Sequence, residues 1–225
     1  MSWTQFENWF VTQSEGQDGE YIANLDDIIS TLEYQQKPLP SYSSFENNFP
    51  KLPYPEHPYY FKPMPANQVY NQVGGNLYNL YMTNNGDDGP YKNACATRVS
   101  LTLNRLGILI PNNSQSIQGG NMSGQTRYYI VNANIMADFL KKTFGNPAPS
   151  NILSEPDCND PQKVADFLKG KNGIYVIVNK NPKSKADGGA GYSGHVDLIK
   201  NGYVIGGANT TPKGGVKFIK IWTLN

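Results

Sequence analysis

The chain has 225 residues, enough for one substantial domain or for one domain with an extension. Its nineteen Lys and Arg residues are balanced by eighteen Asp and Glu residues, which argues against a nucleic-acid-binding protein with a basic surface. No apolar run approaches the roughly 18 residues of a membrane-spanning helix, and the N-terminus lacks the basic and apolar regions of a secretion signal. We therefore expect a protein made in the cytoplasm without a signal peptide, with no nucleic-acid partner and no membrane insertion.

Apolar residues at helical spacing predict two short helices within residues 1–36. The next segment, residues 38–65, holds eight prolines. Proline fixes φ and removes an N–H donor, so this segment is predicted to be neither helix nor central strand. We expect an extended linker that wraps a surface through its aromatic side chains. The sequence thus predicts an N-terminal extension over residues 1–60 and a main domain over residues 61–225.

The middle of the chain alternates helical periodicity with clusters of turn residues. The clearest helix is predicted over residues 94–106, ended by Gly107 and capped by Asn93 or the preceding loop. The other predicted elements are a helix over 68–81 broken at Gly74-Gly75, a loop over 83–90, a Gly-rich loop over 117–125, a strand over 128–131, and helices over 135–144 and 161–168.

The last third changes to strand periodicity. Residues 173–179 form a continuous β-branched run typical of a buried strand. Asn201-Gly202 separates the segments 194–200 and 203–205, which is a strong two-residue hairpin signal because both turn positions favour φ > 0. A further strand is predicted over 216–223. Helices followed by a meander of antiparallel strands indicate an α+β fold rather than alternating βαβ units.

Cysteine and histidine are scarce, with two of each. Zinc sites use closely spaced ligand pairs, and the sequence has none, so we expect neither a metal nor a cofactor. Cys95 begins the helix predicted over 94–106, where free N–H groups and the helix dipole favour a thiolate and can stabilise an oxyanion. The alternative is that this small side chain only packs in the core. Cys158 lies in an acidic segment, which raises the pKa of a thiol.

His195 lies at the start of the strand predicted over 194–200, where period 2 places it on the same face as Asp197. A half-exposed histidine on a solvated strand is the simpler interpretation. His57 lies in the proline-rich segment, which is poorly suited to hold an imidazole in fixed geometry. By elimination, Cys95 and His195 form the most plausible catalytic pair.

A third group should orient the imidazole. Asp197 is close in sequence, but its side chain runs parallel to that of His195 and could point past it. A two-residue turn would place Ala208 opposite His195, and a bulge at Gly206-Gly207 could turn Asn209 inward. The sequence does not separate Asp197 from Asn209.

The segment Asn-Ala-Cys-Ala-Thr-Arg-Val-Ser-Leu (93–101) resembles the nucleophile motif of the type VI secretion amidase effectors of family 4. Further blocks agree in order, namely residues 69–79, 127–140 and 173–178 and the segment Gly-His-Val-Asp-Leu (194–198). The resemblance covers about residues 65–210. It implies a papain-like fold with the nucleophile at the start of a helix packed on an antiparallel sheet, with Cys95 as nucleophile and His195 as general base.

The resemblance also implies an activity and its partners. The family is expected to hydrolyse the amide between D-glutamate and diaminopimelate in peptidoglycan stem peptides, in the periplasm of a neighbouring bacterium. A cognate immunity protein is expected to block the site in the producer. One departure stands out, because Gly207 aligns with the family's aspartate on the strand after the hairpin. One alternative, which Gly207 supports, is an inactive module that binds cell-wall peptide, and a second is a housekeeping cell-wall hydrolase.

Overall fold

The structure is a computed structural model that describes residues 36–54 and 57–225. The two helices predicted within residues 1–36 lie outside the described residues, except for residue 36. Residues Pro38–Asn225 form one compact unit. Within the described residues, no helix combines the length and the apolar character needed to cross a membrane.

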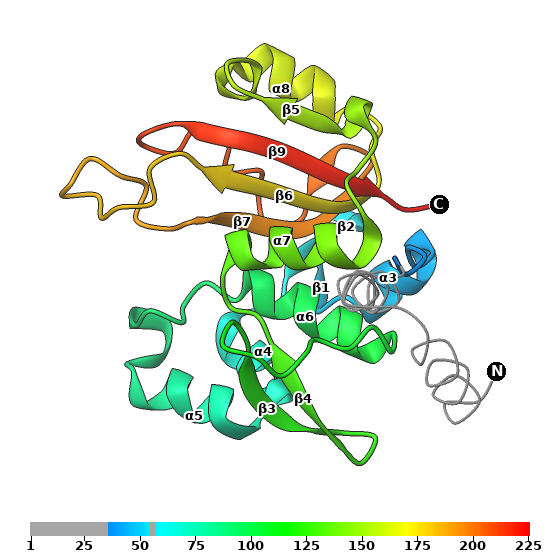
Figure 1. Ribbon diagram of the computed structural model, residues 1–225, viewed down its shortest axis with the longest axis vertical. Helices are drawn as coiled ribbons and strands as arrows, with labels where there is room; N and C mark the ends of the chain where they lie inside the picture. The colour runs from blue at the N-terminus through cyan, green and yellow to red at the C-terminus, as the bar shows by residue number, and fades with distance from the viewer. Residues whose placement is uncertain (1–35, 55–56) are drawn as a thin grey trace, which may run out of the picture. The chain divides into compact units, whose positions relative to one another are not determined.

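A five-stranded antiparallel sheet organises this unit (Figure 1). Its strand order is β5-β9-β6-β7-β8, and all its pairs are antiparallel. The prediction of an α+β fold is confirmed. The predicted meander is wrong in one respect: the last strand, β9, pairs with the other side of β6 instead of extending the hairpin. The strands are β5 (Ile152–Ser154), β6 (Gly173–Asn179), β7 (Gly194–Lys200), β8 (Tyr203–Val204) and β9 (Val216–Thr223).

The hairpin between β7 and β8 turns at Asn201-Gly202, as predicted, with φ of 48° and 84° at the two positions. Lys200 pairs with Tyr203, but the ladder ends at Val204. The predicted pairing of His195 with Ala208 therefore does not form. Beyond the ladder, the N–H of Ile205 still donates to the carbonyl of Leu198, but the N–H of Gly206 donates to the side chain of Asp197 on β7.

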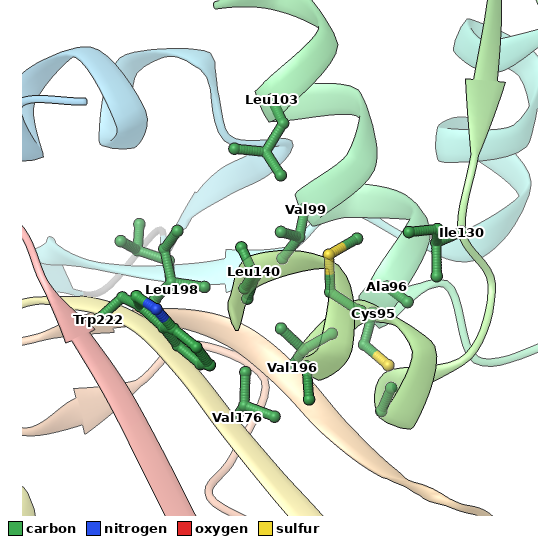
Figure 2. Packing of buried hydrophobic residues seen from close by; sticks show 14 of the residues in the cluster. Cys95, Ala96, Val99, Leu103, Ile130, Leu140, Val176, Val196, Leu198 and Trp222 are labelled. Atoms are coloured by element: carbon green, nitrogen blue, oxygen red, sulfur yellow. The ribbon is translucent and has the colours of Figure 1, made fainter. Parts of the chain in front are cut away.

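Both faces of the sheet are covered, and the central strand β6 is therefore buried along its whole length. One face packs against α6 (Cys95–Arg105) and α7 (Ala133–Phe144), through Val99, Leu140, Val176 and Val196 among others (Figure 2). The opposite face packs against α8 (Pro161–Leu168), with Cys158 in the same cluster. Short 3-10 turns, η2 (Pro149–Asn151) and η3 (Asp157–Asn159), flank β5.

The helices of the middle segment follow the predicted pattern. Asn132 caps α7 by accepting hydrogen bonds from the N–H groups of residues 134 and 135, and Gly145 ends that helix with φ of 83°. Asp160 caps α8 in the same way, and Pro161 fills its first position. These local signals explain why the predicted limits agree with the structure to within two residues.

The Gly-rich segment over 117–125 is the first strand and the turn of a hairpin, not the predicted loop. It forms β3 (Ile117–Met122), which pairs with β4 (Gln125–Tyr129). This hairpin packs beside α4 (Ala66–Val73) and α5 (Gly75–Thr83), which break at Gly74-Gly75 as predicted. A Cβ at Gly75 would overlap the carbonyl of Gly119. The glycines therefore allow close backbone contact between helix and hairpin, and a single 3-10 turn, η1 (Gly86–Asp88), follows.

The proline-rich segment is also more regular than predicted. Residues Tyr42–Asn48 form helix α3, capped by the side chain of Ser41. Strands β1 (Lys51–Tyr54) and β2 (His57–Pro63) form a separate two-stranded sheet. The prediction failed because no proline interrupts residues 41–49, and because a two-stranded ribbon tolerates proline on its outer edges. The aromatic anchoring is confirmed, since Phe45 and Phe49 are buried in the cluster beneath α6.

Candidate active site

Cys95 is the first residue of α6, and Ala94 occupies the N-cap position without a side-chain hydrogen bond. The predicted cap by Asn93 therefore does not form. The first hydrogen bond of the helix runs from Arg98 N to Ala94 O over 2.8 Å. The N–H groups of Cys95, Ala96 and Thr97 consequently have no acceptor within the helix, and they converge at the end that carries the sulfur.

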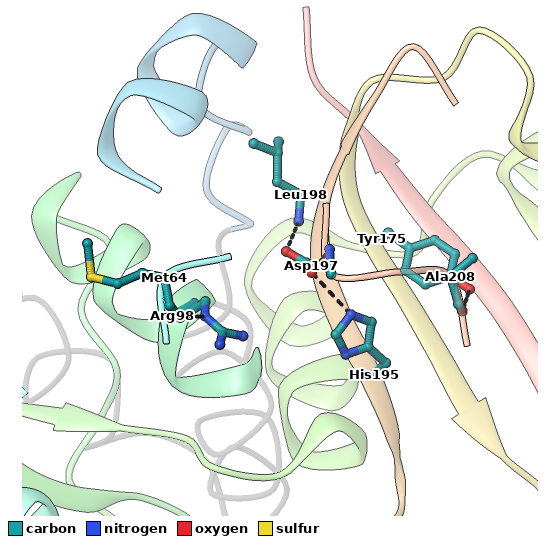
Figure 3. Close-up of polar contacts among 8 residues, drawn as sticks. Met64, Arg98, Tyr175, His195, Asp197, Leu198 and Ala208 are labelled. Atoms are coloured by element: carbon teal, nitrogen blue, oxygen red, sulfur yellow. Dashed lines mark hydrogen bonds and ion pairs between the residues drawn. The ribbon is translucent and has the colours of Figure 1, made fainter. Parts of the chain in front are cut away.

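Strand β7 brings His195 to this helix end. The His195 imidazole lies beside the Cys95 thiol on the wall of one cavity, close enough to lower the pKa of the thiol. Its Nε2 lies 3.1 Å from Oδ2 of Asp197 (Figure 3). Because Nε2 is engaged by the carboxylate, Nδ1 is the ring atom left to face the sulfur. The structure thus brings Cys95, His195 and Asp197 together, and a hydrogen bond joins the imidazole to the carboxylate.

Asp197 is fully buried and accepts two further hydrogen bonds. The N–H of Leu198 donates to Oδ1 over 2.8 Å, and the N–H of Gly206 donates to Oδ2 over 2.7 Å. The sequence suggested that Asp197 could point past the imidazole, but the carboxylate turns back toward the ring. Two backbone donors fix that orientation, and neither can be recognised from the spacing of residues 195 and 197.

Gly206 was not predicted as a site residue, although the structure gives it a defined place. A Cβ at this position would overlap Oδ2 of Asp197 and would lie 3.1 Å from Nε2 of His195. A Cβ at Gly207 would meet nothing within 4 Å. The residue next to the imidazole is therefore Gly206, and not Gly207, which the alignment of the Asn-Gly turns indicated.

Asn209 lies on the wall of the same cavity. Its backbone has φ of 52°, and the carbonyl of the preceding Ala208 accepts a hydrogen bond of 2.6 Å from the hydroxyl of Tyr175. This bond holds the segment after β8 against the sheet (Figure 3). No hydrogen bond joins Asn209 to His195 within the described residues, so Asn209 faces the cavity rather than the imidazole.

Cys95 and His195 open on a cavity of about 360 Å³. Both side chains are largely buried, with 7% of Cys95 and 8% of His195 exposed. The cavity wall contains two further cationic residues and no Asp or Glu. Its lining residues are Pro63, Lys92, Asn93, Ala94, Cys95, Arg98, Tyr192, Gly194, His195, Gly206 and Asn209.

Cys95 and His195 shift each other's pKa values. Burial alone would raise the pKa of the Cys95 thiol, but the hydrogen bond and positive charge of His195 outweigh burial and lower it. For His195, burial opposes the charged form, while hydrogen bonds to Asp197 and Cys95 favour it and raise the pKa to about 10. These opposite directions favour a thiolate–imidazolium pair near neutral pH.

The remaining cysteine and histidine lie elsewhere. Cys158 is buried on the α8 side of the sheet, where its thiol donates to the carbonyl of Val216 over 3.3 Å. Burial, followed by the charge of Glu155, raises the pKa of this thiol. His57 begins strand β2, on the separate two-stranded sheet. Within residues 36–54 and 57–225, no group of three His, Cys, Asp or Glu side chains is arranged to hold a metal ion.

The fold is shared with proteins of known structure. The type VI effector Tae4 from Enterobacter cloacae aligns with a TM-score of 0.57 and 22% identity, over 85% of this chain and 100% of its own. The Tae4–Tai4 effector–immunity complex from Salmonella Typhimurium contains a chain that aligns with a TM-score of 0.56 and 22% identity, over 83% of this chain and 99% of its own. Identities this low show a common fold and nothing more.

The sequence itself supplies the assignment to a family. No curated protein matches the chain. Residues 91–222, which hold Cys95 and His195 and extend into β9, match the model of the family described as type VI secretion system amidase effector protein 4 (Tae4). That match spans more than half of the chain, and it includes α6 and all of the five-stranded sheet except the last residue of β9. The chain therefore belongs to the Tae4 family of type VI secretion amidase effectors.

Proposed function

We propose that this chain is a cysteine-dependent amidase that hydrolyses the bond between D-glutamate and diaminopimelate in peptidoglycan stem peptides. The observation that carries the proposal is that His195, which is hydrogen-bonded to Asp197, lines one cavity with Cys95 at the start of a helix. Membership of a family of amidase effectors supports the reaction type.

In the first half of the proposed reaction, the Cys95 thiolate attacks the amide carbonyl carbon and forms a tetrahedral intermediate. Its oxyanion accepts hydrogen bonds from N–H groups at the start of α6. The imidazolium of His195 then donates its proton to the leaving amine as the C–N bond breaks. A thioester on Cys95 and a free amine are the products.

In the second half, neutral His195 takes a proton from water, whose oxygen attacks the thioester carbon. The C–S bond breaks, the carboxylic acid product leaves, and the thiolate–imidazolium pair is restored. Asp197 keeps the imidazole in the orientation that both halves need. We assign the orienting role to Asp197, because it bonds the imidazole directly, and a substrate-facing role to Asn209 on the cavity wall.

The proposal extends to the biological setting. We infer a papain-like arrangement for the amidase domain, whose predicted start at residue 61 competes with a start at residue 38, where the compact unit begins. The family's place in type VI secretion supports delivery to the periplasm of a target bacterium as an antibacterial toxin. Similar structures solved as effector–immunity complexes support a cognate immunity protein for this chain.

The test is digestion of purified peptidoglycan, followed by mass spectrometry of the released muropeptides. Wild-type protein should release products with a new amino group on diaminopimelate, and Cys95→Ala should release none. Cys158→Ala is the matched control, because it removes the other buried thiol, which lies outside the cavity. It should retain cleavage even if the protein loses some stability.

Each alternative predicts a different result. Binding of stem peptides by wild-type protein without any new amino group would favour an inactive binding module. Cleavage by Cys95→Ala at the wild-type rate would eliminate the covalent mechanism. Cleavage at a different amide would preserve the cysteine mechanism and correct the assigned bond.

A further inference from the structure

Arg98 is a buried cation beside the candidate nucleophile, and the proposed mechanism leaves it without a task. Only 8% of its surface is exposed, yet it lines the cavity together with Cys95. It follows Cys95 by three residues on α6, a spacing that places both side chains on one face of a helix with about 5–6 Å between their Cβ atoms. A charged group is rarely buried to this extent without partners.

The hydrogen bonds of Arg98 leave one end of its guanidinium open. Its Nε donates to the carbonyl of Met64 over 2.9 Å, which fixes the inner edge of the group. Within the described part of the chain, neither of its Nη atoms has a hydrogen-bond partner. Figure 3 shows the terminal nitrogens extending beyond Met64 toward the side where β7 carries His195. Two forked donors are thus held in the cavity wall.

The charges around the cavity favour an anionic ligand. Its lining residues include Lys92, Arg98 and His195 but no Asp or Glu. The negative charges nearby are those of Cys95 and Asp197, which act electrostatically on Arg98. The carboxylate of Asp197 already accepts three hydrogen bonds, including one from His195. A guanidinium with two free N–H edges matches a carboxylate bidentately.

The proposed substrate carries such a group. Glutamate has two carboxyl groups, and only one of them can take part in the scissile amide. The carbon atoms of the two groups are about 5 Å apart in an extended side chain, similar to the spacing between neighbouring side chains on one helix face. We propose that Arg98 binds the free carboxylate of the glutamyl residue while Cys95 attacks the other carboxyl carbon. This inference rests on the proposed function for the identity of the ligand.

The first experiment compares two synthetic peptides on the full chain. One is an alanyl-D-glutamyl-diaminopimelate peptide with a free glutamyl carboxylate, and the other carries a carboxamide at that position. Wild-type protein should prefer the acid by at least about tenfold in kcat/KM, because hydrogen bonds to charged groups are the stronger ones. Arg98→Gln should lose most of this preference, and Arg98→Lys should keep part of it.

The second experiment needs no turnover. Alkylation of Cys95 by anionic iodoacetate is compared with alkylation by neutral iodoacetamide. Thiolate displaces iodide from either reagent, so the ratio of the two rates reports the attraction of an anion to the site. That ratio should fall about tenfold in Arg98→Gln. If Arg98 only balances the charges of Cys95 and Asp197, both rates should change together and the ratio should stay constant.

Arg105→Gln is the matched control. Arg105 lies on the same helix, but its guanidinium donates to the carbonyl of Asn48 over 2.9 Å and to the side chain of Gln72 over 2.7 Å, outside the cavity. This variant should keep both the peptide preference and the alkylation ratio of wild-type protein.

The outcomes separate the inference from the proposed function. Cleavage of both peptides by wild-type protein at equal rates would overturn the role of Arg98 and leave the amidase intact. Cleavage of neither peptide would contradict the proposed function, and the alkylation ratio would still decide whether Arg98 attracts an anion. A melting curve would show whether Arg98→Gln folds. If it does not, the preference of wild-type protein for the acid peptide over the carboxamide, compared with that of Arg98→Lys, tests the role of Arg98.

Discussion

The pKa values of the Cys95 thiol and the His195 imidazole are shifted in opposite directions from those of the isolated side chains. A free cysteine titrates at about 8.5 and a free histidine at about 6.5, so neither is mainly charged at neutral pH. Burial opposes both charged forms, but the hydrogen bonding and charge of His195 lower the pKa of Cys95, and hydrogen bonding to Asp197, followed by that to Cys95, raises the pKa of His195. The pair therefore gains its reactive form from mutual stabilisation, with Asp197 adding to the imidazolium side.

The pH dependence of Cys95 reactivity follows from these directions. Alkylation by neutral iodoacetamide should rise with pH through the pKa of the thiol, which is lowered relative to a free cysteine. Amide hydrolysis should share this acid limb and should fall again near pH 10, where His195 loses its proton. In Asp197→Asn the alkaline limb should move to lower pH, because the carboxylate no longer stabilises the imidazolium. An unchanged alkaline limb would show that Asp197 does not govern the charge of His195.

At the scale of elements, the segment that returns after β8 completes the site. The N–H of Gly206 bonds the carboxylate of Asp197, and the carbonyl of Ala208 accepts a hydrogen bond from Tyr175. The ladder between β7 and β8 stops at Val204, so this segment is free to bond side chains instead of backbone. The fixed orientation of Asp197 therefore depends on a hydrogen bond from Gly206, nine residues further along the chain.

Gly206→Ala tests this dependence. The added methyl group would overlap Oδ2 of Asp197 and crowd Nε2 of His195, so the carboxylate must shift. We expect kcat for amide hydrolysis to fall about 10²-fold, as for other displacements of about 1 Å in a catalytic group. The φ angle of Gly206 lies outside the positive region that disfavours alanine, so displacement of the carboxylate is the main expected effect. The measurement is kcat on a synthetic stem peptide, alongside the melting temperature.

Gly207→Ala provides the contrast on the neighbouring residue. Its Cβ would meet no atom within 4 Å, but its φ of 87° is unfavourable for alanine. This variant should lower the melting temperature and keep most of kcat. Equal losses of kcat in the two variants would show that the segment as a whole matters, rather than the space next to Asp197.

At the scale of the whole molecule, residues 38–60 contribute to the core of the unit Pro38–Asn225. The side chains of Phe45 and Phe49 join the cluster that contains Cys95. The N–H of Tyr42 donates to the carbonyl of Asn225 over 2.7 Å, and Lys200 pairs with Glu46 over 2.7 Å. The predicted boundary at residue 60 stays a prediction, but these contacts favour a boundary near residue 37.

Two truncated chains would distinguish the boundaries. A chain of residues 38–225 should unfold in urea at nearly the same midpoint as the corresponding unit of the full chain. A chain of residues 61–225 should be several kcal/mol less stable, since removal of one buried Phe side chain typically costs about 3–5 kcal/mol. Equal midpoints for both truncated chains would support the boundary at residue 60.

Much of the fold could be predicted because its signals are local. Asn201-Gly202 fixes a hairpin turn through the φ values it allows, and Pro161 with Asp160 fixes the start of α8. The α+β class followed from the same kind of evidence. The strand β3 and the helix α3 were missed, because glycine and proline suggest loops unless the packing around them is known. Gly119 contacts Tyr129 and Val73 so closely that only glycine fits there, which is a tertiary fact.

The sequence by itself determined which residues were available for the chemistry, since it offers so few cysteines and histidines, and it placed Cys95 at a helix start and His195 on a strand. The alternation of side chains along a strand also placed His195 and Asp197 on one face of β7 and Val196 and Leu198 on the other. Only the tertiary structure decided that Asp197 rather than Asn209 bonds the imidazole and that Arg98 lines the same cavity. The physical reason is that hydrogen-bond partners depend on distances of a few ångströms between segments, and these distances are set by how helix, sheet and returning loop pack together.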